Sequence, residues 1–258
     1  MRFNAPLALG VLALLLSVVA IVAVAAPKPR PQPCVDMSFE GDLFLVCAFD
    51  SRREDLRFAD RGAEGVYLRS FRALRGALGN DAARVRYAMN AGMFDDDGEP
   101  IGLYVEAGAE KHGLNTAHGP GNFHMLPNGV FSADSDGALH VETTDAYALR
   151  APHPQWATQS GPMLVINDEL HPAIQPNGAS LNIRNGVGVR DAHHAFFVIS
   201  EAPVSFGRLA RFFRDRLHCA NALYLDGSVS SVWAPARGRM DRGHLLWPML
   251  VALERPRS

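Results

Sequence analysis

The sequence predicts a single mixed α+β domain with a strand-rich core and few helices, placed after an N-terminal signal or anchor segment. Three observations support this fold class. The chain has 258 residues, of which 48% are apolar and 20% are charged, so it can bury one substantial core. Short apolar runs alternate with Gly, Pro, Asn and Asp, a pattern typical of strands joined by turns and functional loops. Only two segments carry apolar residues at helical spacing, so few helices are expected.

The N-terminus carries a targeting signal. Residues 7–26 are uncharged and rich in Leu, Val and Ala, and about 20 residues at roughly 1.5 Å rise per residue can cross the apolar core of a bilayer. Ala23 and Ala25 also fit the cleavage site of a signal peptide. We therefore expect an exported protein, periplasmic or extracellular, whose only membrane contact is this segment if it stays uncleaved. The predicted parts are a signal peptide or membrane anchor over 1–26, a Pro-rich linker over 27–33 and one domain over 34–258.

The first strands of the domain are predicted to form a hairpin. Residues 35–39 and 43–49 flank a turn, and their pairing would bring Cys34 and Cys47 together near its open end. A disulfide is plausible there in an oxidising compartment. Unpaired cysteines are the alternative, since spacing alone does not determine pairing. Cys219, beside an apolar strand, is expected to be a buried thiol.

The remaining elements follow from the period of the apolar residues. Helical spacing predicts helices over 65–78 and 206–219, and it places the arginines of the second helix on a solvated face. Apolar runs bounded by turn residues predict strands over 44–49, 85–89, 101–106, 123–126, 129–132, 163–166, 182–189, 194–200 and 222–225.

The overall charge argues against one class of partner. Lys and Arg number 25, Asp and Glu number 27, and the formal net charge is −2. A protein that binds nucleic acid normally shows a basic excess, so no nucleic-acid partner is expected.

Three predicted strands run into loops that are rich in Gly and polar side chains, at residues 87–98, 158–163 and 223–228. Loops held by a rigid sheet are where binding and catalytic groups are commonly found. An Asp-Gly pair after a strand is also a frequent turn. One such loop alone would therefore be weak support for a site.

Asp226 is the strongest single candidate. A carboxylate at the end of an apolar strand is partly desolvated, which raises its pKa toward the range of a general acid. Ser228, Ser230 and Ser231 follow it, and their hydroxyls can bind sugar or phosphate oxygens. The segment lacks the second glycine of a Gly-x-Ser-x-Gly nucleophile elbow, which argues against a serine hydrolase of that type.

Two further groups of charged residues are candidates for ligand binding, a single arginine and a run of carboxylates. Arg184 interrupts a run of apolar and small residues, so it is expected to meet either a structural carboxylate or a bound phosphate or carboxylate. The run 95–99 contains four carboxylates, which makes a divalent metal at Asp95 and Asp97 conceivable, although the spacing is not that of an EF-hand. A solvated acidic turn is the alternative. No other cofactor is implied.

Four motifs, in this order along 85–233, resemble the phosphodiester glycosidase family: 89–94, 160–162, 184–188 and 225–231. The resemblance implies hydrolysis of a sugar-1-phosphodiester at its glycosidic bond, with a carbohydrate or sugar-phosphate as substrate. It implies that Asp226 is the catalytic carboxylate, acting as a base or stabilising an oxocarbenium-like centre, and that Arg184 holds the phosphate. Asn90 is the third catalytic candidate. The residues expected to contact substrate are Gly92, Ser160, Gly161, Pro162, Gly227, Ser228 and Ser230.

The chain departs from the family pattern at two loops. The family's Asn-Gly-Gly-Phe-Phe is Asn-Ala-Gly-Met-Phe at 90–94, and its Asp-Gly-Gly-Gly-Ser is Asp-Gly-Ser-Val-Ser at 226–230. Ser228 and Val229 in place of glycines restrict the backbone and add side chains beside the site. These variants look closest to an exported bacterial subgroup, for which the resemblance predicts a fold and a site and leaves the sugar open.

The function expected from the sequence is an exported hydrolase that cleaves a sugar-1-phosphodiester in an envelope or extracellular glycan. Two alternatives remain. The protein could bind a glycan or cell-wall polymer without catalysis, or it could be a metal-dependent esterase that uses the acidic loop.

Overall fold

The computed structural model describes residues 32–95 and 97–256. The predicted signal or anchor segment and most of the linker lie outside these residues. Within the described part of the chain, no helix combines the length and the apolar composition that a membrane crossing requires.

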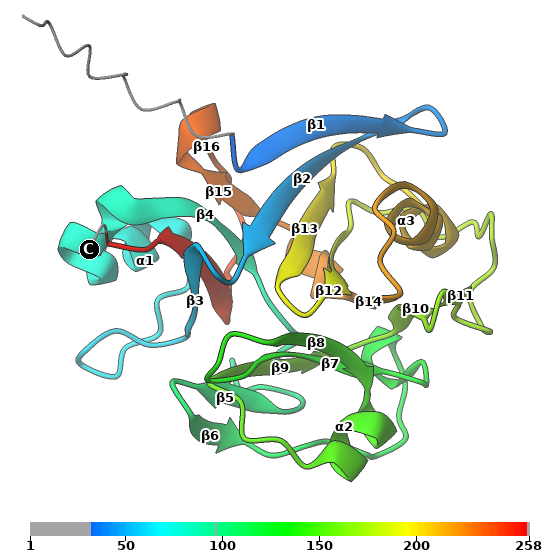
Figure 1. Cartoon of the computed structure of the whole chain (residues 1–258), viewed down its shortest axis with the longest axis horizontal. Helices are drawn as coiled ribbons and strands as arrows, with labels where there is room; N and C mark the ends of the chain where they lie inside the picture. Colours follow the sequence, from blue (N-terminus) through cyan, green and yellow to red (C-terminus); the bar gives the residue numbers. More distant parts are fainter. Residues whose placement is uncertain (1–31, 96, 257–258) are drawn as a thin grey trace, which may run out of the picture. The chain divides into compact units, whose positions relative to one another are not determined.

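The described strands form three antiparallel sheets (Figure 1). The first has the order β1 (Cys34–Phe39), β2 (Asp42–Asp50), β13 (His194–Ser200), β12 (Asn185–Asp191), β14 (Asn221–Tyr224), β10 (Met163–Ile166) and β11 (Glu169–Leu170). The second has the order β16 (Arg239–Met240), β15 (Val232–Ala234), β4 (Val85–Asn90), β17 (Met249–Glu254) and β3 (Glu54–Ala59). The third has the order β6 (Ala109–His112), β5 (Tyr104–Glu106), β9 (Trp156–Ser160), β7 (Gly129–Ala133) and β8 (Leu139–Thr143).

Helices are few and short, which together with the three sheets confirms the predicted α+β class. The α-helices are α1 (Phe71–Leu78), α2 (Thr144–Arg150) and α3 (Phe206–Arg211), and α3 continues into a π-helical turn, η3 (Phe212–Arg216). Single 3₁₀ turns are η1 (Gly79–Arg84), η2 (Asn122–His124), η4 (Gly227–Val229) and η5 (Pro235–Arg237).

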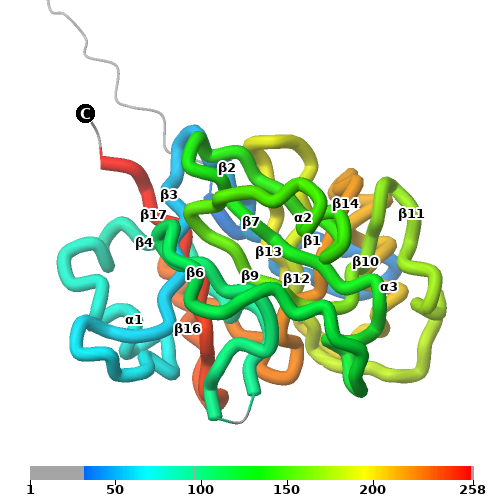
Figure 2. The backbone as a smooth tube through the Cα atoms, turned by 90° about the horizontal axis from the view of Figure 1, so that it is seen from below, coloured from blue at the N-terminus to red at the C-terminus, as the bar shows by residue number. Residues whose placement is uncertain are grey.

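The three sheets share one core, and Phe197 lies where they meet. Its ring centroid is 5.7 Å from that of Tyr87 in the second sheet and 5.5 Å from that of Phe131 in the third. Figures 1 and 2 show the third sheet, in green, beside β12 and β13. Aromatic contacts of this kind add about 0.5–1.5 kcal/mol each beyond area burial. The core therefore fixes how the sheet ends, and the loops on them, lie relative to one another.

The continuous apolar runs of the first sheet arise because both of its faces are covered. In β2, Leu45 and Cys47 face the core shared by the three sheets, whereas Phe44 and Val46 face α3 and η3. Phe44 stacks on Phe212 with ring centroids 4.1 Å apart. A strand that is buried on both faces needs apolar residues at successive positions. The resulting apolar runs are what allowed these strands to be predicted from the sequence.

A serine side chain sets where α1 begins. The hydroxyl of Ser70 accepts a hydrogen bond from the N–H of Ala73, so α1 begins at Phe71 and not at residue 65 as predicted. Arg69 before it has φ 49°, in the left-handed region, which ends any helix there. The second predicted helix is confirmed as α3 with η3. Arg208 and Arg211, expected only to be solvated, pair with Glu40 in the turn between β1 and β2.

Other predicted elements were wrong or incomplete. Residues 123–126 were expected as a strand, but Phe123 and His124 belong to the 3₁₀ turn η2, and the two residues after it run into Pro127, which has no N–H to donate to a ladder. The strand predicted over 101–106 is confined to β5. Elements not predicted at all are β3, β6, β8, β9, β11, β15, β16, β17 and α2.

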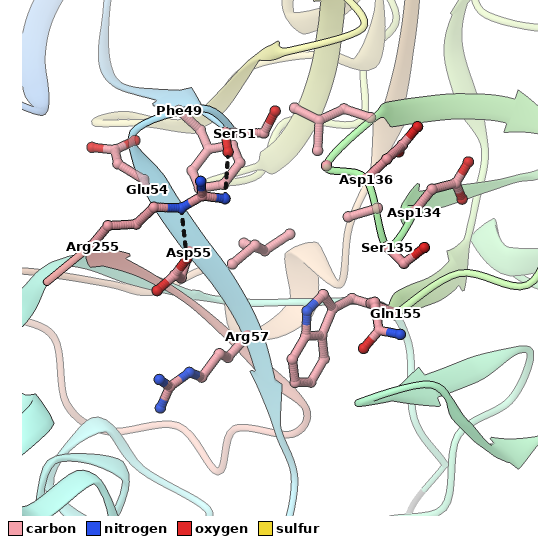
Figure 3. A pocket seen from close by; sticks show the side chains of 15 residues that line it. Phe49, Ser51, Glu54, Asp55, Arg57, Asp134, Ser135, Asp136, Gln155 and Arg255 are labelled. Atoms are coloured by element: carbon pink, nitrogen blue, oxygen red, sulfur yellow. Dashed lines mark hydrogen bonds and ion pairs between the residues drawn. The ribbon is translucent and has the colours of Figure 1, made fainter. Parts of the chain in front are cut away.

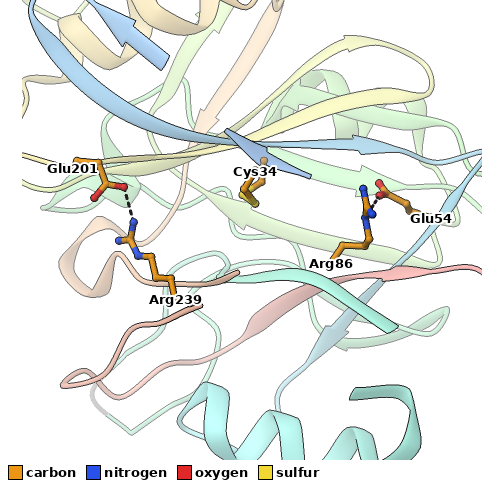
Figure 4. Close-up of a disulfide and its surroundings, with 6 residues drawn as sticks. Cys34, Glu54, Arg86, Glu201 and Arg239 are labelled. Carbon is orange, nitrogen blue, oxygen red and sulfur yellow. Dashed lines mark hydrogen bonds and ion pairs between the residues drawn. A yellow bond between two sulfur atoms is a disulfide. The ribbon is translucent and has the colours of Figure 1, made fainter. Parts of the chain in front are cut away.

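The hairpin at the start of the domain is confirmed. Cys34 lies opposite Cys47 in the register of β1 and β2, and a disulfide joins them (Figure 4). Cys219 is a buried free thiol whose pKa is raised to about 12 by burial, as expected for a cysteine that packs as a small apolar residue.

Candidate active site

The candidate site forms where the first and second sheets meet at their ends. β4 of the second sheet ends at Asn90, and β14 of the first sheet leads through Leu225 to Asp226. The N–H of Asp226 donates to the carbonyl of Ala91 over 3.0 Å, and the N–H of Leu225 donates to the carbonyl of Asn185 over 3.2 Å. Two loops that are 136 residues apart in the chain are thereby joined.

Asn90 is the central polar residue of this junction. The residue as a whole is 1% exposed. Its Nδ2 donates to the carbonyl of Asp226 over 2.6 Å. Its Oδ1 accepts from Nδ2 of Asn185 and from the N–H of Ser231, each over 2.9 Å. Both ends of the amide are therefore used within the protein. Asn185 was not singled out in the sequence; its position next to Arg184 in the third motif was the available signal.

The carboxylate of Asp226 is half-buried and stands without a cation. Its Oδ1 accepts from the N–H of Ser228 over 3.1 Å and from the hydroxyl of Ser228 over 2.6 Å. Burial raises the pKa of Asp226, and the two bonds from Ser228 lower it by less, so the pKa lies above its ordinary value. Among the described residues no Arg, Lys or His forms an ion pair with it. This is the electrostatic setting expected of a proton acceptor in a site.

The hydroxyl of Ser230 holds the loop after Asp226 against its neighbours. Its Oγ lies 3.1 Å from the carbonyl of Ile183, 3.2 Å from that of Gly227 and 3.3 Å from Oδ1 of Asn185. Ser228 is the exposed hydroxyl of the loop. The side chain of Ser230 is thus directed at the protein, and that of Ser228 lies at the surface beside the carboxylate.

Arg184 lies beneath this loop and is 1% exposed. Its guanidinium donates to the carbonyls of Val204 over 2.9 Å and Ser180 over 3.0 Å, and to the hydroxyl of Tyr224 over 3.2 Å. The ring of Phe206 lies 3.6 Å from its Cζ. Within residues 32–95 and 97–256 no carboxylate pairs with it, so the structural carboxylate considered from the sequence is absent there. Neutral oxygens and an aromatic face hold the charge, and burial lowers the pKa of Arg184.

Tyr224 connects Arg184 to the loop that carries Asp226. A Cβ added at Gly227 would overlap the Tyr224 hydroxyl, so only glycine lets the loop approach this close. The hydroxyl accepts from Nη1 of Arg184, which lowers its pKa, although burial raises the pKa overall. Arg184, Tyr224 and Gly227 therefore form a chain of contacts that positions the residue after Asp226.

The other predicted contact residues lie in tightly packed backbone next to the site. The N–H of Gly92 donates to Oγ1 of Thr158 over 3.2 Å, and an added Cβ at Gly92 would overlap that oxygen. Ser160 is fully buried, and its hydroxyl has no hydrogen-bond partner among the residues that the structure describes. The bond between Gly161 and Pro162 is cis, and the carbonyl of Pro162 accepts from the N–H of Tyr224 over 3.1 Å. These residues join β9 and β10 to the strand that leads to Asp226.

The acidic loop is closed on itself. Oδ1 of Asp95 accepts from the N–H of Asp97 over 3.0 Å and from the N–H of Glu99 over 2.9 Å, and Glu99 pairs with Arg61. Asp96 lies outside the described residues. In the remainder of the chain that the structure describes, no three His, Cys, Asp or Glu side chains converge on one point. The geometry of Asp95 is that of an acidic turn, the alternative considered from the sequence.

A cavity away from the candidate site, which we call the distal cavity, lies toward the opposite ends of the strands (Figure 3). It has a volume of about 450 Å³ and is lined by Glu54, Asp55, Arg57, Asp134 and Arg255 among others. Glu54 pairs with Arg86, which precedes Asn90 by four positions in β4, or about 13 Å at the rise of a strand. Its charged side chains are largely paired with one another or with nearby residues.

Comparison with known proteins gives a consistent result. The sequence model of the phosphodiester glycosidase family matches residues 83–245. Uncharacterized protein YigE of Escherichia coli strain K12 is 40% identical over 154 residues, which are 60% of this chain. The matched part spans 60% of the length of that relative.

Two solved structures are similar in fold. One is the zebrafish N-acetylglucosamine-1-phosphodiester alpha-N-acetylglucosaminidase catalytic domain auto-inhibited by its pro-peptide, with a TM-score of 0.60, 13% identity, and coverage of 86% of this chain and 82% of that one. The other is a hypothetical protein from Synechocystis, with a TM-score of 0.56, 12% identity, and coverage of 86% and 61%. At this identity the two structures support the fold and not the substrate.

Proposed function

This chain belongs to the phosphodiester glycosidase family, and from that premise we propose that it hydrolyses a sugar-1-phosphodiester at the bond between the anomeric carbon and the phosphate oxygen. The observation that carries the proposal is the carboxylate of Asp226, which has no cation partner and a raised pKa, in a loop fixed by Asn90. We further propose that the substrate belongs to an envelope or extracellular glycan.

The proposed reaction needs one well-placed base. A phosphate monoester leaves as a stable anion, so protonation of the leaving group matters less than in most glycosidases. Asp226 accepts a proton from a water molecule, the water oxygen bonds to the anomeric carbon, and the bond from that carbon to the phosphate oxygen breaks. The phosphate takes the electron pair of that bond. The negative charge of Asp226 also stabilises an oxocarbenium-like centre.

Asn90 and Arg184 both direct their polar atoms at the protein in this scheme. Both amide ends of Asn90 are bonded within the protein, and its contact with the carbonyl of Asp226 holds the catalytic loop against β4. The donors of Arg184 are directed at Val204, Ser180 and Tyr224. We therefore propose that both are positioning residues, and that the phosphate is held elsewhere. Ser228, exposed beside the carboxylate, is the hydroxyl best placed to contact substrate.

Export is part of the proposal. The apolar run 7–26 supports delivery across a membrane, and the disulfide between Cys34 and Cys47 suits an oxidising compartment. Protease accessibility of the chain in intact cells with a permeabilised outer envelope would test this, and a chain found wholly in the cytoplasmic fraction would contradict it.

The activity is tested with the purified chain and two substrates of the same sugar, the methyl phosphodiester of N-acetylglucosamine-1-phosphate and uridine diphosphate N-acetylglucosamine. We expect sugar release by the wild type and a loss of kcat of about 10²–10⁴-fold in Asp226→Asn. Asp134→Asn, in the distal cavity, is the matched control and should retain full activity. Binding without release by the wild type would favour the non-catalytic alternative, and release abolished by a chelator and restored by one divalent ion would favour the metal-dependent esterase.

A further inference from the structure

Arginines without a partner are concentrated in one region of the molecule. Most described arginines form an ion pair, a hydrogen bond or a ring contact. In residues 32–95 and 97–256 the exceptions are Arg72, Arg75, Arg216 and Arg242, all with exposed side chains. Three of these four, Arg72, Arg75 and Arg242, line adjoining cavities. An exposed guanidinium that is left unpaired keeps its donors available for an anion.

These cavities form what we call the arginine groove, whose lining comes from α1, from β15 and β16, and from the segments next to them. The inner part has a volume of about 230 Å³ and is lined by Ser231, His244 and other residues. The outer part is shallower and larger, about 1070 Å³. Arg72, Met240 and Arg242 line both parts, so the two are continuous.

One described carboxylate, Asp241, lines the groove, and it is already paired with Arg239, so it leaves Arg72, Arg75 and Arg242 unneutralised. Asp241 is the acidic residue of its lining, and its oxygens accept from Nε and Nη2 of Arg239 over 2.9 and 3.0 Å and from the N–H of Val232 over 3.0 Å. Arg239 also pairs with Glu201 (Figure 4). The positive charge is local, because the chain as a whole has a net charge of −2.

The inner end of the groove adjoins the candidate active site. Ser231 lines it, and the N–H of Ser231 donates to Oδ1 of Asn90, whose Nδ2 donates to the carbonyl of Asp226. A bound anion at Arg72 and Arg242 would thus lie next to the loop that carries the catalytic carboxylate. Like charge repels phosphate from Asp226 itself, so the sugar faces the carboxylate and the anionic part faces the groove.

We propose that the arginine groove binds the phosphate side of the substrate and that this side carries two or more negative charges, as in a pyrophosphate or a chain of phosphodiesters. This inference rests on the proposed function for the direction in which the substrate lies. It assigns the phosphate to Arg72 and Arg242, in place of the buried Arg184.

A kinetic comparison tests the number of charges. The substrates are the methyl phosphodiester, with one charge, and uridine diphosphate N-acetylglucosamine, with two. For the double variant Arg72→Gln/Arg242→Gln we expect KM for the second substrate to rise about tenfold or more, with kcat within about twofold. The rise for the methyl phosphodiester should be smaller. Arg216→Gln removes an equally unpaired arginine elsewhere on the surface and should change neither KM.

A binding experiment separates this inference from the proposed function. Inorganic tripolyphosphate is titrated into the full chain by calorimetry at low salt, and the double variant should bind about tenfold more weakly than the wild type or Arg216→Gln. Thermal unfolding of each variant checks that it is folded. Absence of sugar release with arginine-dependent binding would remove the proposed function and retain the groove. Sugar release with unchanged KM and no arginine-dependent binding would overturn the groove and retain the function.

Discussion

The distal cavity and the region of the active site differ in whether their charged side chains are paired. In the distal cavity Arg255 pairs with Asp55 over 2.8 Å, Arg57 with Asp81 over 2.9 Å, and Glu54 with Arg86 over 3.0 Å. Near the active site, among the described residues, the Asp226 carboxylate has no cation partner, and Arg72, Arg75 and Arg242 of the groove have no anion partner, whereas Arg239 beside them pairs with Asp241 and Glu201. Opposite charges that satisfy each other serve the fold, whereas charges left apart are available to a ligand.

Arg184 does not fit this division. It lies near the site and has no anion partner among the described residues, yet each of its guanidinium nitrogens donates to a neutral oxygen of the protein. We expect Arg184→Ala to lower the free energy of unfolding by about 3–5 kcal/mol, because it leaves the Tyr224 hydroxyl and two carbonyls without their charged donor. Urea denaturation would measure the change. A loss below about 1 kcal/mol would mean that the neutral partners do not depend on the guanidinium.

Tyr224→Phe tests whether the contact between Arg184 and Tyr224 serves catalysis as well as the fold. It removes the oxygen that accepts from Arg184 and lies against Gly227 but keeps the ring. We expect kcat to fall about tenfold with little change in KM, since the loop is displaced and the groove is intact. Steady-state kinetics would show this split. An unchanged kcat would place Tyr224 in the packing of the fold only.

Arg255→Gln addresses the distal end. The pair of Arg255 with Asp55 is partly exposed, so its loss should cost about 0.2–1 kcal/mol of stability and leave kcat and KM unchanged. Parallel denaturation and activity assays give both values. A defect in activity with normal stability would show that the distal cavity takes part in function.

The smallest expected effect is in the pH dependence of Asp226. Its pKa is higher in the folded state than the ordinary 3.8, so ionising it costs stability as the pH rises from 3.8 through the raised folded value. Asp226→Asn removes that cost. Its melting temperature should equal that of the wild type at low pH and be no lower at pH 7. A melting temperature that falls relative to the wild type as the pH rises would contradict the raised pKa.

The same pKa predicts the acid limb of catalysis. The base must be ionised to accept a proton, so kcat/KM of the wild type should fall as the pH decreases through a value above 3.8. The residual activity of Asp226→Asn should lack this limb. The pH profile of a fluorogenic sugar phosphodiester would record both.

Predictions from the sequence succeeded where burial left a simple pattern. β10 and β13 are doubly covered strands, and their apolar runs gave the observed bounds. β3 and β17 lie side by side, yet neither was predicted. β3 mixes charged and apolar residues next to a charged turn, whereas β17 is an apolar run directly after Pro248 and was missed although its pattern is that of a buried strand. The start of α1 depended on the cap at Ser70, which periodicity does not report.

The site was predictable in part for a related reason. Asn90 and Asp226 each follow an apolar strand, which made them visible as strand-end polar residues, and the structure brings them within 2.6 Å of one another. The pairing of Asn185 with Asn90, and the use of Arg184 by Tyr224, depend on which strands become neighbours. The arginine groove could not be predicted from the sequence for the same reason. Its unpaired arginines come from α1 and from the loop before Leu246, which are distant in the chain.

The contact of Tyr224 with Gly227 has a consequence for how relatives of this chain could vary. Within the loop 227–229, Gly227 is the position where a hydroxyl excludes a side chain, whereas Ser228 and Val229 carry side chains at the next two positions. A homologue could therefore exchange the glycines after the first one freely, but a larger residue at position 227 would require loss of the tyrosine oxygen at 224. The two positions should change together, so a Tyr-x-Asp-Gly signature would trace this version of the site across sequences better than a glycine run.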